Sequence, residues 1–393
     1  MNTQLESKRR ILAANMWPIW HFGDTNKRYQ SFLARGRPEF NGLIDQVLLY
    51  DEIVIPTDDF LSLTVLIGVL GERAVLDLLS TNSLKFIRLK GAFAYIGNGR
   101  GIQDIERIGG KAKADENPVT ADIDFSVNWA ISGLDVKLKD SNLAKKVLDN
   151  SIEINPKAIL NVVKDETYKD VIGNEELQNY FALRNKDLNN LSGIKPTDVR
   201  IYGGPDSETL IPKDEIDTYL MLNNTNVELK LMELSGCVDM TTSNPIGRVL
   251  KAKFDRQKNQ AQDSLITLKE IADIPGYGEA VLQKKIEFKE ILKIKESKNG
   301  KEFRNWFHSN CNGGDDKSIA KEYIKILQDT EKISSLPVRI LRFIITTGVG
   351  LIPGVGSILG PSATLFDSFF MEKWGHGNSP KFFINDLKQI AKQ

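Results

Sequence analysis

The feature that most constrains this chain is a stretch of 24 residues without a single charge, residues 343–366, in a protein in which 26% of the residues are charged. A transmembrane helix needs about 20 such residues, so this stretch is long enough for lipid insertion. Pro353 and Gly354 stand at its centre, and proline removes a backbone hydrogen bond that a continuous helix requires. We therefore expect a helical hairpin, two short apolar arms that meet at a turn.

The glycines and the flanks of this segment fit contact with lipid or with another helix. Glycines four residues apart let helix backbones approach closely. Basic and aromatic side chains, which favour the headgroup level of a bilayer, stand on either side of the segment. The candidate membrane or partner residues are therefore Arg339, Arg342, Gly350, Leu351, Pro353, Gly354, Ile358, Gly360 and Trp374.

The same hairpin also fits the interior of an ordinary domain. Apolar runs of about 10–14 residues are more often core than membrane. The tail that follows is amphipathic, and its apolar side chains could pack back on such a hairpin: Phe382, Phe383, Leu387 and Ile390. Whether residues 343–366 enter lipid or lie in a core stays open at this point.

Composition excludes several classes of protein and gives little support to a metal site. The 52 Lys and Arg residues balance the 52 Asp and Glu residues, which excludes a histone-like polycation, and 41% hydrophobic content excludes a disordered tail. Two cysteines make no disulfide framework, and three histidines leave little material for zinc. We expect no metal, no cofactor and no catalytic residue that the sequence can name. Asn15 and Pro18 interrupt the only candidate signal sequence, so we expect a cytoplasmic protein.

The organisation of the chain indicates an α+β protein that is mostly α. Residues 43–55 are predicted as a buried strand, 60–82 as a helix, and 84–89 and 92–96 as two short strands. Beyond a Gly- and Pro-rich stretch at 109–122, helical periods dominate. We expect an N-terminal α/β domain over residues 1–115, a mostly helical domain over 116–335, and the hydrophobic Gly/Pro-rich hairpin with its amphipathic tail over 336–393.

A short run at 271–286 resembles a helix-hairpin-helix, a module that binds nucleic acid. Pro275, Gly276, Tyr277 and Gly278 follow an apolar residue and precede a predicted helix. The resemblance implies that Gly276 and Gly278 expose backbone N–H groups, which bind a phosphate without reading base sequence. A Pro-Gly turn between two helices also forms without any ligand, so both interpretations are kept.

Five carboxylates flank the strand predicted at 43–55: Asp45, Asp51, Glu52, Asp58 and Asp59. Paired acids at strand ends can hold Mg²⁺ for phosphodiester cleavage, which would make the protein a metal-dependent nuclease. The alternative is that Asp58 and Asp59 cap a helix, because a carboxylate there accepts otherwise unsatisfied N–H groups. His308 and Cys311 are predicted at a helix end and are too few for a zinc site.

Three classes of function follow. The first is a non-enzymatic effector or interaction protein whose C-terminal hairpin, within residues 338–393, meets a membrane or an oligomer partner. A bacterial stress or phage-defence protein that permeabilises membranes would have this layout, as a homo-oligomer or as a subunit of a complex. The second is a nucleic-acid-binding protein that uses Gly276 and Gly278. The third is an enzyme built on the carboxylates around Asp51 and Asp58.

Overall fold

The computed structural model describes residues 8–16, 37–57, 60–89, 95–97, 105–107, 142–154, 156–184, 186, 188–191, 216–242, 244–254, 277–311 and 380–391. The chain divides into two compact units. Residues 1–43 and 50–258 form the sheet unit, and residues 44–49 and 259–393 form the helical unit. The described part is mostly helical with a small parallel sheet, in agreement with the predicted mostly α class. The predicted boundaries after residues 115 and 335 stay predictions.

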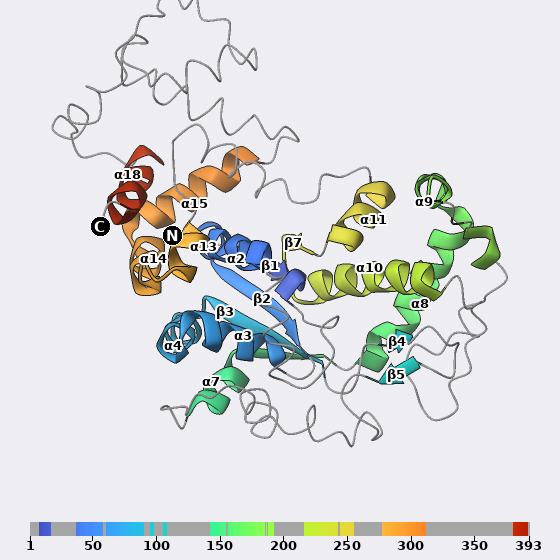
Figure 1. The fold of residues 1–393 in the computed structure, drawn as a ribbon, viewed down its shortest axis with the longest axis horizontal. Helices are drawn as coiled ribbons and strands as arrows, with labels where there is room; N and C mark the ends of the chain where they lie inside the picture. The colour runs from blue at the N-terminus through green and yellow to red at the C-terminus, as the bar shows by residue number, and fades with distance from the viewer. Residues whose placement is uncertain are drawn as a thin grey trace, which may run out of the picture. The chain divides into compact units, whose positions relative to one another are not determined.

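The sheet unit is built on five parallel strands in the order β6-β3-β2-β1-β7 (Figure 1). They are β1 (Arg10–Ala13), β2 (Glu52–Thr57), β3 (Leu84–Leu89), β6 (Ser151–Ile154) and β7 (Asp239–Thr241). The central strands are apolar on both faces, since every residue from Ile11 to Ala13 and from Ile53 to Ile55 is buried. Such runs suit a parallel sheet that is covered on both sides.

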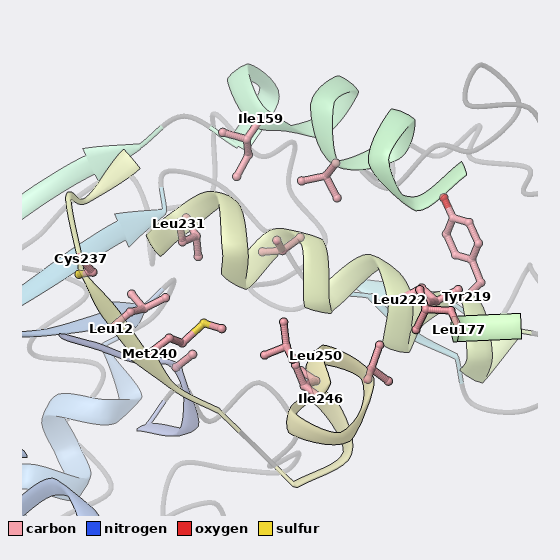
Figure 2. Packing of buried hydrophobic residues seen from close by; sticks show 14 of the residues in the cluster. Leu12, Ile159, Leu177, Tyr219, Leu222, Leu231, Cys237, Met240, Ile246 and Leu250 are labelled. Atoms are coloured by element: carbon pink, nitrogen blue, oxygen red, sulfur yellow. The ribbon is translucent and has the colours of Figure 1, made fainter. Parts of the chain in front are cut away.

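Alternate residues of the strands divide into two cores, one on each face of the sheet. Figure 2 shows Leu12 and Met240 on one face, beside side chains of α8 (Pro156–Gly173), α10 (Ile216–Leu234) and α11 (Asn244–Phe254). Residues of one parity point to one face because side chains alternate along a strand. On the other face, the ring of Phe60 meets that of Phe86 edge to face, with ring centroids 5.5 Å apart.

Short helices complete the sheet unit. α3 (Leu61–Leu70) and α4 (Glu72–Ser80) lie between β2 and β3, α7 (Leu143–Asp149) precedes β6, and α9 (Glu175–Ala182) follows α8. Asn174 caps α9, because its side chain accepts a hydrogen bond of 3.0 Å from the Leu177 N–H. The remaining described elements are 3-10 turns at Ala14–Met16 (η1) and Leu188–Leu191 (η4) and an antiparallel pair, β4 (Tyr95–Gly97) with β5 (Ile105–Arg107).

The helical unit contains α13 (Tyr277–Leu282), α14 (Phe288–Glu296), α15 (Lys298–Cys311) and α18 (Pro380–Ala391), together with the last residues of α2 (Arg37–Leu49). Its core is aromatic. The rings of Phe303 and Phe383 are stacked with centroids 4.1 Å apart, and Phe307 lies 5.7 Å from Phe303. All three rings are buried.

The strand predicted over residues 43–55 is wrong in its first half. α2 continues to Leu49, and β2 begins only at Glu52. Every residue from Leu43 to Tyr50 is buried, including the polar Asp45 and Gln46. The stretch therefore has no exposed face whose spacing would distinguish a helix from a strand.

The helix predicted over residues 60–82 is divided in two. α3 ends at Leu70 and α4 begins at Glu72, with Gly71 between them at φ 86°, a left-handed value that glycine adopts without strain. The strand predicted at 84–89 is confirmed as β3. Of the strand predicted at 92–96, the described residues show Tyr95–Gly97 as β4.

Candidate functional site

The residues predicted to meet a membrane or partner lie outside the described part of the chain, from Arg339 to Trp374. Gly276 also lies outside it, whereas Gly278 is buried in the first turn of α13, a helix of six residues. The nucleic-acid interpretation of this turn stays a prediction. Among the helices that the structure describes, none is both long and apolar enough to cross a bilayer.

The site that the structure does describe is the attachment of the C-terminal segment to the helical unit. α15 ends at Cys311, α18 begins at Pro380, and α18 packs against both α14 and α15. The Phe303–Phe383 stack lies at this contact, and the Asn299 side chain donates a hydrogen bond of 2.8 Å to Asp386. Residues 312–379, which include the uncharged stretch, therefore start and finish at neighbouring helices of one unit.

Polar groups inside the helical unit are used for structure. Arg304 is 4% exposed, and its guanidinium donates to the Lys295 carbonyl at 2.8 Å. The His308 ring nitrogen Nε2 lies 2.8 Å from the Leu49 carbonyl and donates to it, since a carbonyl oxygen only accepts. Burial raises the pKa of the Tyr277 hydroxyl well above its usual range, and nearby Asp45 adds to this effect. The Tyr277 hydroxyl therefore stays protonated, and His308 serves as a hydrogen-bond donor within the unit.

Of the carboxylates proposed for an enzyme, Asp51 and Glu52 stand at the amino end of β2, whereas Asp58 and Asp59 lie outside the described residues. The interpretation of the protein as a metal-dependent nuclease therefore stays a prediction. In the described part of the chain, no group of three Asp, Glu, His or Cys side chains is arranged to hold a metal ion.

Glu52 is held by three cations at the amino edge of the sheet. Its carboxylate lies 2.6 Å from Lys8, 2.6 Å from Arg10 and 3.4 Å from Lys85, while its own side chain is only 1% exposed. Burial alone would raise the pKa of this carboxyl, but the hydrogen bonds from Lys8 and Arg10 and the charge of Lys85 lower it overall. Glu52 is therefore a structural anion rather than a candidate acid or base.

Two more groups of this edge, the Cys237 thiol and the Asp239 carboxyl, have raised pKa values. Burial raises the pKa of the Cys237 thiol to about 11, so it is not a nucleophile at neutral pH. Burial also raises the pKa of Asp239, although hydrogen bonds from the Tyr50 hydroxyl and the Met240 N–H oppose the effect. Cys237 is thus a core residue.

A buried polar cluster that the sequence did not reveal joins α8, α10 and α11. The Lys253 ammonium lies 2.6 Å from the Asp170 carboxylate and 2.7 Å from the Asn226 side-chain oxygen. Asn226 in turn donates to Asp170 at 2.8 Å and to Thr167 at 3.1 Å. A buried charge must be paired, and here each member satisfies the others. The cluster fixes how three helices pack.

The carboxyl edge of the sheet carries a second set of polar groups that the sequence did not reveal. Thr241 donates to the Asn15 side-chain oxygen at 2.8 Å, the Phe60 N–H donates to Thr57 at 2.7 Å, and Arg88 pairs with Glu153 at 3.3 Å. These residues lie close to the carboxyl ends of their strands or just beyond them, so their proximity becomes visible only once the order of the strands is known.

No protein-family model matches this chain, and no curated protein or solved structure shows significant similarity to it.

Proposed function

We propose that this protein is a non-enzymatic effector or interaction protein whose segment 343–366 engages a membrane or an oligomer partner. The observation that carries the proposal is the run of 24 uncharged residues in a chain of otherwise ordinary charge content. A bacterial stress or phage-defence protein that permeabilises membranes fits this layout. In this proposal the protein is cytoplasmic until the segment meets lipid or its partner.

The packing of α18 supports a hairpin over a single span. While α18 stays on α15, both ends of the chain between Cys311 and Pro380 stay with one unit. A segment that enters a bilayer from there must therefore leave it on the same side. Two helical arms of about ten residues, each about 15 Å long, would reach the middle of a hydrocarbon core about 30 Å thick. Pro353 and Gly354 stand where such a hairpin turns.

Liposome flotation and dye leakage of the full chain test the proposal. Leu351→Arg should abolish both, because a charge near the bilayer centre costs about 2.5–3.5 kcal/mol even on the most lenient insertion scale. The matched control is Leu183→Arg, which adds the same charge at a leucine that is 85% exposed in the sheet unit. This control should float and leak like the wild type.

The melting temperature and solubility of the variants in buffer show whether residues 343–366 enter lipid or lie in a core. A Leu351→Arg variant that stays folded but no longer causes dye leakage supports membrane engagement. An oligomeric wild type that binds no liposomes and becomes monomeric on Leu351→Arg points to the protein partner instead. If the wild type neither binds liposomes nor self-associates, and Leu351→Arg precipitates, the segment is ordinary core and the proposal is wrong.

A deletion for the same assay should be internal. Removing everything after residue 338 would also remove α18, whose Phe383 ring fills the core of the helical unit. Replacing only residues 343–366 by a short flexible linker leaves α15 and α18 to pack as before. Loss of flotation in this variant, with an unchanged helical core, assigns lipid binding to the segment itself.

A further inference from the structure

The carboxyl edge of the sheet presents polar side chains of β6, β3, β2 and β7, and Asn15 stands just beyond the end of β1. Glu153 of β6 is in register with Arg88 of β3, and Arg88 is in register with Thr57 of β2. On the far side, Ala13 of β1 is in register with Thr241 of β7, and Asn15 follows two residues later. Residues in register on parallel strands point to the same face, so these groups line a single edge.

This edge contains the point at which the order of the strands reverses. From β1 the chain builds outward through β2, β3 and β6, and from β6 it crosses back to add β7 on the other side of β1. In open parallel sheets, ligands bind outside the carboxyl ends of the strands at such a reversal. Here the reversal lies between β1 and β7, where Thr241 is hydrogen-bonded to Asn15.

Two buried hydroxyl groups at this edge have no hydrogen-bond partner among the described residues. Thr242, which directly follows β7, is 4% exposed, and Ser62, in the first turn of α3, is fully buried. A buried hydroxyl without a partner costs free energy, and native proteins usually satisfy such groups with a neighbour, a water molecule or a ligand. A ligand at the carboxyl edge would supply both partners.

The start of α3 adds donors for an anion. Phe60 precedes the helix in a left-handed conformation, and no side chain of a described residue caps the helix. The first-turn N–H groups of a helix form the positive end of its dipole. The Phe60 ring lies against Phe86, two residues before Arg88 on the same strand face, so the helix start and the Arg88 charge belong to one face and one edge.

We propose that this edge binds the phosphate group of a small molecule at the start of α3, with the rest of the molecule reaching the Asn15–Thr241 pair. Helix N–H groups, the Ser62 hydroxyl and the Arg88 guanidinium are the donors that phosphate oxygens accept. Thr242 serves the rest of the ligand at the strand reversal. This inference rests on the sheet unit and is independent of the role proposed for residues 343–366.

The carboxylate of Glu153 adds a condition to the test. It pairs with Arg88 at this edge and would repel a bare phosphate. A magnesium ion bound to the phosphates offsets that charge. Titration calorimetry on the full chain should therefore use inorganic phosphate and ATP, each with and without Mg²⁺, and adenosine at matched ionic strength as the phosphate-free probe.

Ser62→Ala is the informative variant because Ser62 forms no hydrogen bond with the described residues that its loss would break. The unliganded variant should fold like the wild type and bind Mg²⁺–ATP about ten-fold more weakly. Its matched control is Ser83→Ala, which removes another buried serine hydroxyl at the opposite end of β3, where Thr81 donates to it at 3.0 Å. The control should keep the wild-type affinity.

Thr241→Val separates the two parts of the proposed ligand site. It should weaken the binding of ATP but leave that of inorganic phosphate unchanged, since phosphate would not reach the Asn15–Thr241 pair. The proposal fails if neither phosphate nor ATP binds, or if adenosine binds as tightly as ATP. It also fails if Ser62→Ala and Ser83→Ala weaken binding equally, because the effect would then come from the fold and not from the edge.

Discussion

At the scale of single residues, the clearest consequence of the structure concerns Glu52. Replacing it by glutamine leaves Lys8, Arg10 and Lys85 without their buried counter-charge. Breaking a buried ion pair costs about 3–5 kcal/mol, and because Lys8 and Arg10 are partly exposed we expect about 2–3 kcal/mol for Glu52→Gln. Urea unfolding at neutral pH measures this loss.

The control for Glu52 is Glu166→Gln, which removes the same charge from an exposed pair with Lys169. Exposed ion pairs contribute about 0–1 kcal/mol, so the urea concentration at which half of the Glu166→Gln variant is unfolded should hardly change. A shift as large as that of Glu52→Gln would mean that the lost charge, and not the buried network, sets the cost.

The same residue makes a prediction about pH. The pKa of Glu52 is lowered from its ordinary value of 4.5, so its ionised form stabilises the folded protein above that value. This contribution is lost as the pH falls through the lowered pKa of the folded state. The difference in stability between wild type and Glu52→Gln should therefore be largest near neutral pH and shrink below about pH 4.5. A difference that stays constant down to acid pH would contradict it.

At the scale of helices and strands, the sequence predicts those elements that are bounded by strong signals. The strand predicted at 84–89 forms β3, and the helix predicted over 60–82 is present as α3 and α4 on either side of Gly71. The sequence does not predict β1, β6 and β7, which have only three or four residues each. Such short strands hold no measurable period, and only their neighbours in the sheet make them strands.

The carboxyl edge could not be predicted for the same reason. Asn15 and Thr241 stand 226 residues apart in sequence and are hydrogen-bonded because β1 and β7 pair in register. The cluster of Lys253, Asp170 and Asn226 likewise depends on how three helices face one another. By contrast, the uncharged segment 343–366 is a property of composition, so the sequence alone was sufficient to find it.

α18 provides a prediction about an element. Phe383→Ala removes a ring that is 1% exposed and stacked on Phe303, which should cost about 3–5 kcal/mol and loosen α18 from α15. Limited proteolysis should then cut within residues 380–391 at protease concentrations that spare the wild type. Gln389→Ala, at an exposed position of the same helix, should behave like the wild type. Equal cleavage of both variants would show that α18 is not held by its aromatic contact.

At the scale of the whole molecule, the two units have separate cores although the chain passes between them more than once. Leu222 is fully buried in α10 among the side chains of the sheet unit, and Phe383 is buried in the helical unit. Substitutions in separate cores should lower stability locally, since regions of one protein can open with different free energies.

Hydrogen exchange of the full chain, followed by mass spectrometry, tests this separation. Leu222→Ala should cost about 2–5 kcal/mol and speed exchange in β1, β2 and α10, while α14, α15 and α18 keep their protection. Phe383→Ala should give the reverse pattern. Leu183→Ala, at an exposed leucine of the sheet unit, should change the exchange of neither unit. If either core substitution speeds exchange equally everywhere, the chain opens as one cooperative body. A ligand bound at the sheet would then also stabilise α18, through which the C-terminal segment is attached to the helical unit.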